Sequence, residues 1–117
     1  MTLFIKSTLF VIPFISAVLQ ATEIDHIYAG KFVWGHEVRS ISLCNQQTWH
    51  WAYLHEPNNK MIEYYIKNQN KPYQEIYIKF KGHFSSMNST GFSELYNSKI
   101  QLTEIIEYSF EIPKSCH

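Results

Sequence analysis

Residues 72–84, PYQEIYIKFKGHF, alternate apolar and polar side chains along the chain. Ile76, Ile78 and Phe80 fall on one face of an extended chain, and the residues between them fall on the other face. A period of two over such a length is typical of a β-strand with one buried face. The run therefore predicts a strand, and comparable runs elsewhere predict a mainly β protein.

Residues 29–44, AGKFVWGHEVRSISLC, form a longer run in which the alternation shifts. Phe32 and Val38 occupy even positions, whereas Ile41 begins an odd series. A change of parity indicates a bulge, a bend or a turn. Gly35 lies where a strand can bend sharply. We expect either one long coiled strand or two strands joined by a kink.

One helix interrupts the strands, within residues 58–70, NNKMIEYYIKNQN. Its apolar residues recur at helical spacing, and Asn58 or Asn59 can cap the helix start. Pro72 follows, so the helix is expected to end before it, after about 10–12 residues.

Two further strands are expected at residues 48–54, TWHWAYL, and at residues 98–112, where a break in parity at Ile105 suggests a bulge. If the first run counts as two strands, a short helix lies between the third and fourth of five. This is the element order of an OB-fold, a five-stranded Greek-key barrel. Long, repeatedly bent strands favour a small closed barrel, although an open α+β sheet gives a similar order.

Residues 1–21, MTLFIKSTLFVIPFISAVLQA, combine one lysine with an apolar stretch and no acidic residue. This pattern is typical of a secretory signal peptide and is short for a membrane-spanning helix. The expected domain then comprises residues 22–117. An uncleaved membrane anchor is the alternative, and membrane contact is expected through this segment alone.

Without residues 1–21, which carry Lys6, the chain has a net charge of about −1 with neutral histidines. A nucleic-acid partner requires a basic patch for the phosphates, so we expect none.

Cys44 and Cys116 are the two cysteines of the chain. In an exported protein, an even number of cysteines indicates a disulfide. The alternative is a reduced protein in which both thiolates and His50 form an open metal site. Because histidines scattered over the surface or the barrel mouth explain the pattern more simply, we expect no metal and no cofactor.

Catalytic motifs do not stand out. His36-Glu37 resembles half of a zinc-protease motif, but position 40 is Ser40 where that motif needs a second histidine on a helix. In a strand, His36 and Glu37 would point to opposite faces. We therefore expect a protein that is not an enzyme.

Aromatic residues gather in and near residues 48–54. Trp49, Trp51 and Tyr53, together with Tyr77, are a possible binding face of the kind on which OB-folds stack bases or sugars. The alternative is that these side chains form the core and the barrel wall.

The order of several short motifs resembles the C-terminal OB-fold domain of NlpE-type bacterial envelope lipoproteins and related small uncharacterised exported proteins. The similarity extends from about Tyr28 to Cys116. Its markers are Gly30, Gly35-His36-Glu37-Val38, Cys44, Pro72-Tyr73, Gly82, Gly91-Phe92 and Tyr96.

The resemblance implies a bacterial periplasmic OB-like barrel, with a disulfide that joins the end of the first strand run to the C-terminus, here Cys44 to Cys116. Members of the group are linked to envelope stress signalling, surface adhesion and copper tolerance. This chain has no cysteine directly after the apolar stretch, where a lipid would be attached, and no Cys-x-x-Cys pair, so a lipid anchor and a copper role are not expected.

The functional expectation is a non-enzymatic periplasmic or secreted module. It would interact with another envelope protein, or report envelope stress or redox state through its disulfide. The alternative is binding of a small ligand or a glycan to the aromatic face.

Overall fold

The computed structural model describes residues 24–86 and 91–117, together with Val11. Apart from Val11, the expected signal peptide (residues 1–21) lies outside the described residues. Within them, no helix has the length and apolar character needed to cross a membrane. The elements are β1 (His26–Gly35), β2 (Val38–Leu43), β3 (His50–Leu54), η1 (Glu56–Asn58), α1 (Asn59–Asn68), β4 (Ile76–Ser85), η2 (Gly91–Leu95) and β5 (Lys99–Ser109).

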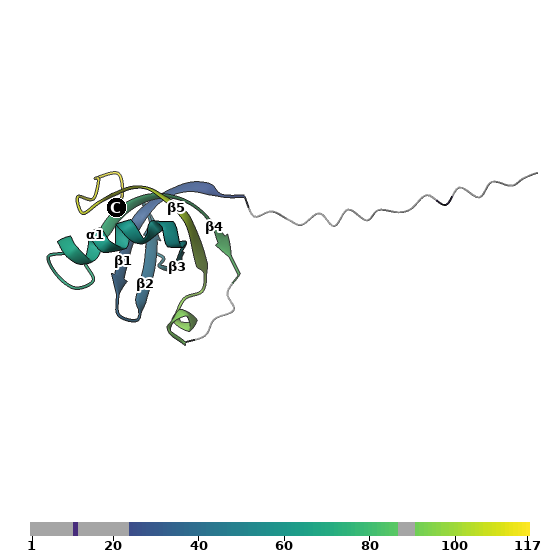
Figure 1. Ribbon diagram of the computed structural model, residues 1–117, viewed down its shortest axis with the longest axis horizontal. Coiled ribbons are helices and arrows are strands. Elements are labelled where there is room, and N and C mark those ends of the chain that lie inside the picture. The colour runs from purple at the N-terminus through teal and green to yellow at the C-terminus, as the bar shows by residue number, and fades with distance from the viewer. Residues whose placement is uncertain (1–10, 12–23, 87–90) are drawn as a thin grey trace, which may run out of the picture.

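The five strands form a closed barrel in the order β1-β2-β3-β5-β4 (Figure 1). Four of the neighbouring pairs are antiparallel, including β1 with β4, which closes the barrel, and β3 and β5 are parallel. The short helix α1 lies between the third and fourth strands. The expected OB-like barrel is therefore confirmed, and the open sheet is not formed.

The run 29–44 forms two strands joined by a turn of two residues, His36 and Glu37, with Gly35 paired to Val38. The placement of His36 and Glu37 on opposite faces of one strand was therefore wrong. Across a two-residue turn, the sequence numbers of direct partners differ by an odd number. The residues that face the barrel interior therefore have even numbers in β1 and odd numbers in β2. The parity shift in the sequence is this hairpin.

The turn escapes sequence rules because Glu37 has a φ of 72°. Hairpin turns with positive φ usually carry Gly, Asn or Asp. A glutamate in this conformation costs about 1–2 kcal/mol, which the surrounding structure must offset.

The barrel interior is filled by fully buried apolar side chains of all five strands, and α1 covers one end of it. Burial of each large apolar side chain contributes about 1.5–3 kcal/mol. Tyr65 of α1 is 0% exposed and its ring packs edge-on against Phe32 at 6.4 Å. Its hydroxyl donates a hydrogen bond of 2.6 Å to the carbonyl oxygen of Gln74. The barrel core comprises Phe32, Ile41, Ala52, Ile76, Ile78, Phe80, Ile100 and Leu102, with Met61, Ile62 and Tyr65 from α1.

Two bulges bend β5 against β4. Phe80 pairs with Ile105 and the preceding residue of β4 with Glu107, so one residue of β5 is extra there. The expected bulge near Ile105 is thereby confirmed. A second irregularity lies before Gly82, where a Cβ atom would stand 2.1 Å from the carbonyl oxygen of Gln101. Gly82 thus allows two backbones to approach closely.

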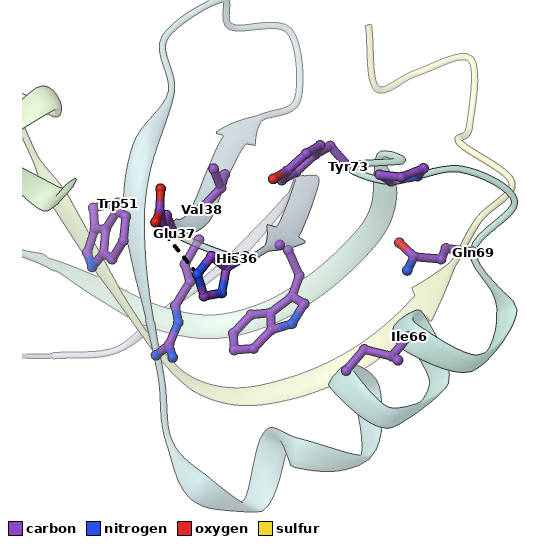
Figure 2. A pocket seen from close by; sticks show the side chains of 11 residues that line it. His36, Glu37, Val38, Trp51, Ile66, Gln69 and Tyr73 are labelled. Carbon is purple, nitrogen blue, oxygen red and sulfur yellow. Dashed lines mark ion pairs between the residues drawn. The ribbon is translucent and has the colours of Figure 1, made fainter.

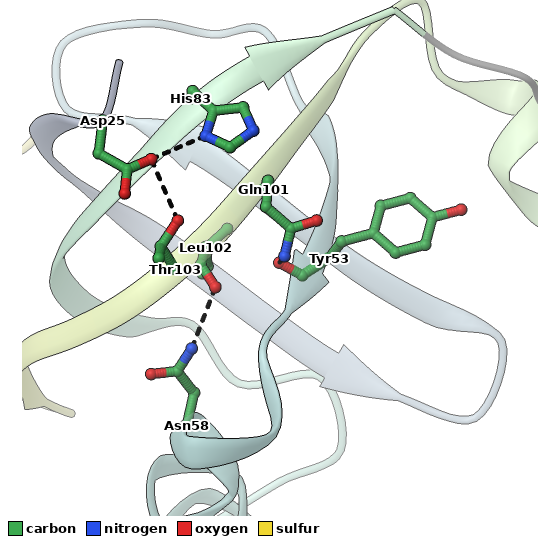
Figure 3. A network of polar contacts seen from close by, with 7 residues as sticks. All are labelled: Asp25, Tyr53, Asn58, His83, Gln101, Leu102 and Thr103. Atoms are coloured by element: carbon green, nitrogen blue, oxygen red, sulfur yellow. Dashed lines mark hydrogen bonds and ion pairs between the residues drawn. The ribbon is translucent and has the colours of Figure 1, made fainter. Parts of the chain in front are cut away.

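Asn58 stands at the N-cap position of α1, but its side chain does not cap the helix. Its Nδ2 atom donates to the carbonyl oxygen of Leu102 at 3.0 Å (Figure 3). The backbone N–H of Ile105 donates to its Oδ1 atom at 2.8 Å. The side chain is buried, so both bonds form away from water. Asn58 therefore joins the start of α1 to the bulged part of β5.

Asp25 anchors the beginning of β1 to the other side of the same region (Figure 3). Its Oδ1 atom lies 2.7 Å from Nδ1 of His83 and accepts a hydrogen bond of 3.1 Å from the Thr103 hydroxyl. The hydrogen bond from His83 lowers the pKa of the Asp25 carboxyl below its usual value.

Cys44 and Cys116 form a disulfide with a Cα–Cα distance of 4.3 Å. The bond joins the end of β2 to the C-terminal tail, as expected. It also removes the two thiolates that the alternative metal site with His50 required. Cys116 is buried, at 1% exposure, whereas Cys44 is partly exposed.

Replacing both cysteines with serine (Cys44→Ser, Cys116→Ser) is expected to lower the free energy of unfolding by about 4 kcal/mol, because the cross-link closes a long loop in the unfolded chain. The two residues are 72 positions apart. Urea denaturation of the oxidised protein and the double variant measures the difference. A reductant should shift the wild type alone, and a change below about 1 kcal/mol would contradict the estimate.

Asn58→Ala is expected to lower the free energy of unfolding by about 1–3 kcal/mol, because it leaves the backbone N–H of Ile105 without its partner. The carbonyl oxygen of Leu102 keeps the hydrogen bond from the backbone N–H of His55. Asn59→Ala is the matched control, since Asn59 is exposed at the start of the same helix. Thermal and urea denaturation provide the measurement. Equal effects of the two substitutions would show that Asn58 acts only through local helix stability.

Candidate functional site

A pocket opens between the β1–β2 turn, the C-terminal end of α1 and the loop that leads into β4 (Figure 2). We call it the hairpin pocket. Its volume is about 600 Å³, within the range of ligand pockets in proteins. The lining residues are Trp34, Gly35, His36, Glu37, Val38, Arg39, Trp51, Ile66, Gln69, Pro72 and Tyr73.

Trp34 and Arg39 are direct cross-strand partners near the end of the hairpin. The guanidinium carbon of Arg39 lies 4.5 Å from the centroid of the Trp34 ring, a cation–π contact. Trp34 is half-buried and packs against the core, whereas Arg39 is exposed. The core thus fixes the indole, and the indole orients the arginine at the pocket.

The turn residues supply a second polar group. Nε2 of His36 lies 3.6 Å from a carboxylate oxygen of Glu37, and both side chains face solvent. Figure 2 shows this ion pair at the rim, on the side of the pocket toward Trp51. The pair is too exposed to add much stability, because water screens it.

Tyr73 forms the wall opposite α1 and has a φ of 58°, although it is not a glycine. Its ring lies over Gly35, where a Cβ atom would be 2.1 Å from Cε1 of Tyr73. Among the described residues other than glycine, three have positive φ, and two of them, Glu37 and Tyr73, line this pocket. Strained backbone gathers at binding sites because the strain holds side chains in position.

The edge of β2 crosses the hairpin pocket. The register between β2 and β3 contains two pairs, Ser40 with Trp51 and Ile41 with His50. Val38 and Arg39 pair with β1 on their other side but have no registered partner on β3. β3 therefore diverges from β2 where the pocket lies, and beyond Trp51 it pairs with β5 alone.

The two faces of this edge contribute different lining residues. Arg39 lies on the face that continues into the barrel interior, as its partner Trp34 does. Val38 and Trp51 lie on the outer face, because neighbouring strand residues alternate and Trp51 pairs with Ser40. An extended peptide placed along this edge would therefore contact Trp34 and Arg39 with one of its faces and Trp51 with the other.

The predicted aromatic face is brought together only in part. Trp51 and Tyr53 contact each other with ring centroids 6.4 Å apart and planes at 71°. Tyr96, which was not predicted, packs against Trp51 at 5.4 Å and 58°. Tyr77 pairs with Ser109 at the C-terminal end of β5, whereas Trp51 pairs with Lys99 at its N-terminal end. Tyr77 is therefore not part of the same face.

Trp49, the fourth predicted residue, precedes β3 and is half-buried. Of the predicted residues, Trp51 alone lines the hairpin pocket. The residues that sequence reasoning missed there include Trp34, Arg39 and Tyr73. Gly35 and Pro72-Tyr73 stood among the markers of the family resemblance, which was the available signal for this site.

His50 is buried, at 7% exposure, and the disulfide engages the two cysteines that would have joined it in the alternative metal site. Its Nδ1 atom is hydrogen-bonded to the Ser98 hydroxyl, and its ring packs edge-on against Phe84 at 5.1 Å. Nε2 has no hydrogen-bond partner among residues 24–86 and 91–117. Burial lowers the pKa of His50, because a charged imidazole would lose its hydration.

A double-mutant cycle tests whether Tyr73 is held against Gly35. Gly35→Ala alone is expected to lower the free energy of unfolding by about 1–3 kcal/mol, because the new methyl group displaces the ring. In a Tyr73→Ala background, the same change should be neutral or slightly stabilising, since alanine restricts the unfolded chain. Urea denaturation of the four proteins gives the coupling. Additivity within about 0.5 kcal/mol would contradict the contact.

Comparisons of the chain with protein-family models, with curated proteins and with solved structures found no match.

Proposed function

We propose that this protein is a non-enzymatic OB-fold module of the bacterial periplasm, which binds an extended segment of another envelope protein in the hairpin pocket. The observation that carries the proposal is the β2 edge, which crosses the pocket at Val38 and Arg39 without a registered partner on β3. Export is supported by the signal-like residues 1–21 and by the disulfide.

A strand is the ligand that this edge accommodates best. A peptide that adds to an exposed sheet edge gains main-chain hydrogen bonds, and pockets for alternate side chains give specificity. The hairpin pocket offers Trp34 and Ile66 to one face of such a strand, and Trp51 to the other. Ile66 is 55% exposed, so it is an apolar side chain available for contact.

The lining residues support binding rather than covalent chemistry. The set contains two tryptophans, a tyrosine, an isoleucine and a proline, with Gln69 and the charged groups around them. Its ionisable groups other than Arg39 are His36, Glu37 and Tyr73, and the pair of His36 and Glu37 is exposed to water at the rim. Aromatic residues and arginine are the residue types enriched at binding hot spots.

A redox-reporting role is the second candidate, and the disulfide favours it. Reduction would release the C-terminal tail from β2 and leave Cys44 as the more accessible thiol. Cys116 is buried, which is typical of a structural cross-link. A thiolate that reduces the bond would therefore have to attack the sulfur of Cys44. This role is compatible with binding at the hairpin pocket.

Glycan binding to the aromatic face receives less support. The rings of Trp51, Tyr53 and Tyr96 are inclined to one another at 71° and 58°, so they present no common flat surface. Each ring could stack one sugar or base, but the three rings form no continuous platform.

Site-specific photo-crosslinking in the producing organism tests the proposal. A photoreactive amino acid at position 66 is expected to give discrete adducts with another envelope protein, because Ile66 lines the pocket. Position 106 is the matched control, since Ile106 is also an exposed isoleucine, at 44%, and does not line the pocket. Equal adducts from both positions, or adducts with glycan alone, would overturn the proposal.

A further inference from the structure

We infer that the segment bound in the hairpin pocket carries an acidic residue, aspartate or glutamate, opposite Arg39. The inference rests on the proposed function and goes further, because it names the chemistry of the partner. It starts from one side chain, Arg39, that makes no hydrogen bond or ion pair with the residues that the structure describes.

Arg39 is the sole lysine or arginine among the lining residues. Its contact is the face of the Trp34 ring at 4.5 Å, and the described part of the chain offers it no ion pair. The nearest carboxylate along the chain, Glu37, is paired with His36 instead. The guanidinium is therefore positioned and retains its hydrogen-bond donors for an external acceptor.

The Trp34 contact makes this arginine more than an ordinary surface charge. Packing on an indole limits the rotamers of the arginine, so less entropy is lost when an acceptor binds. A guanidinium presents donors in a planar fork that matches the two oxygens of a carboxylate. A lysine would offer one compact charge and no such fork.

Strand addition determines where the carboxylate would stand. Direct partners on neighbouring antiparallel strands have Cβ atoms about 4.5–5.5 Å apart, and opposite charges at such positions stabilise the pair. The residue opposite Arg39 on an added strand would lie on the same face as Arg39 and Trp34. Residues two positions away on that strand share the face, and they would meet the apolar wall that includes Ile66.

Peptide libraries test this charge requirement. Three heptapeptide libraries, N-acetylated and C-amidated, carry valine, isoleucine, threonine and tyrosine at the outer positions and a central glutamate, glutamine or lysine. The immobilised oxidised protein is expected to retain the glutamate library at least about tenfold better than the glutamine library, and the lysine library least. Quantification of eluted peptides gives the ratios.

Charge reversal provides the matched variant. Arg39→Glu should reverse the order, so that the lysine library is retained best, and Arg39→Lys should lower the preference for glutamate without reversing it. Lys60→Glu is the control, because Lys60 is exposed at the start of α1, lies outside the pocket lining and gives the same change in net charge. It should retain the wild-type order.

The outcomes separate the inference from the proposed function. Equal retention of the glutamate and glutamine libraries, with both lost in Ile66→Asp, would overturn the acidic partner and leave peptide binding intact. An unchanged preference for glutamate in Arg39→Glu would also overturn the inference. No retention of any library, together with no protein adduct from position 66, would overturn both.

Discussion

The pairing of β1 with β4 is the contact on which the rest of the structure depends. Through it, a strand of ten residues serves two neighbours, β4 along His26–Phe32 and β2 along Gly30–Gly35. Closure gives every strand two neighbours, so no strand has an edge that is free along its whole length, as an open sheet would have. β3 pairs with β2 through His50 and Trp51, and its remaining residues, 52–54, pair with β5 alone. The part of β2 that β3 leaves without a partner, at Val38 and Arg39, borders the hairpin pocket. The candidate site is thus a consequence of the divergence of β3 from β2.

The polar contacts beneath this architecture explain how bent strands remain paired. The backbone N–H of Ile105, at the bulge of β5, donates its hydrogen bond to a side chain, and an unsatisfied buried group costs about 1–3 kcal/mol. The carbonyl oxygen of Leu102 accepts a second bond from the backbone N–H of His55. Asn58 supplies both a donor and an acceptor to Leu102 and Ile105, which an aliphatic side chain or a carboxylate could not do. On the other side of the same region, Asp25 bonds His83 and Thr103. The bulges are therefore stabilised from two sides by side chains that come from different elements.

The sequence predicted those parts of the fold that depend on local periodicity. Strand alternation, the helix before Pro72, the bulge near Ile105 and the pairing of the two cysteines all follow from residue type and spacing. The turn at His36-Glu37 did not, because its positive φ falls on a glutamate and depends on the pairing of Gly35 with Val38 on either side of the turn. The role of Asn58 was hidden for a related reason. Its partners lie 44 and 47 residues away, and an asparagine before a helix looks the same whether it caps the helix or not.

The candidate site was harder to predict than the fold, because its residues come from separate segments whose proximity depends on register. Trp34 and Arg39 meet because a two-residue turn makes them direct partners, and a turn one residue longer would separate them. Tyr73 reaches the pocket because Gly35 leaves room for its ring. Two strained residues, a glycine contact and an arginine held on an indole therefore converge on one place. The two positive φ values cost stability that a simple barrel could retain, whereas the contacts of Tyr73 with Gly35 and of Arg39 with Trp34 return part of it. Such costs, gathered around a solvent-exposed opening, are better explained by the need to hold a binding surface in position than by the stability of the barrel itself.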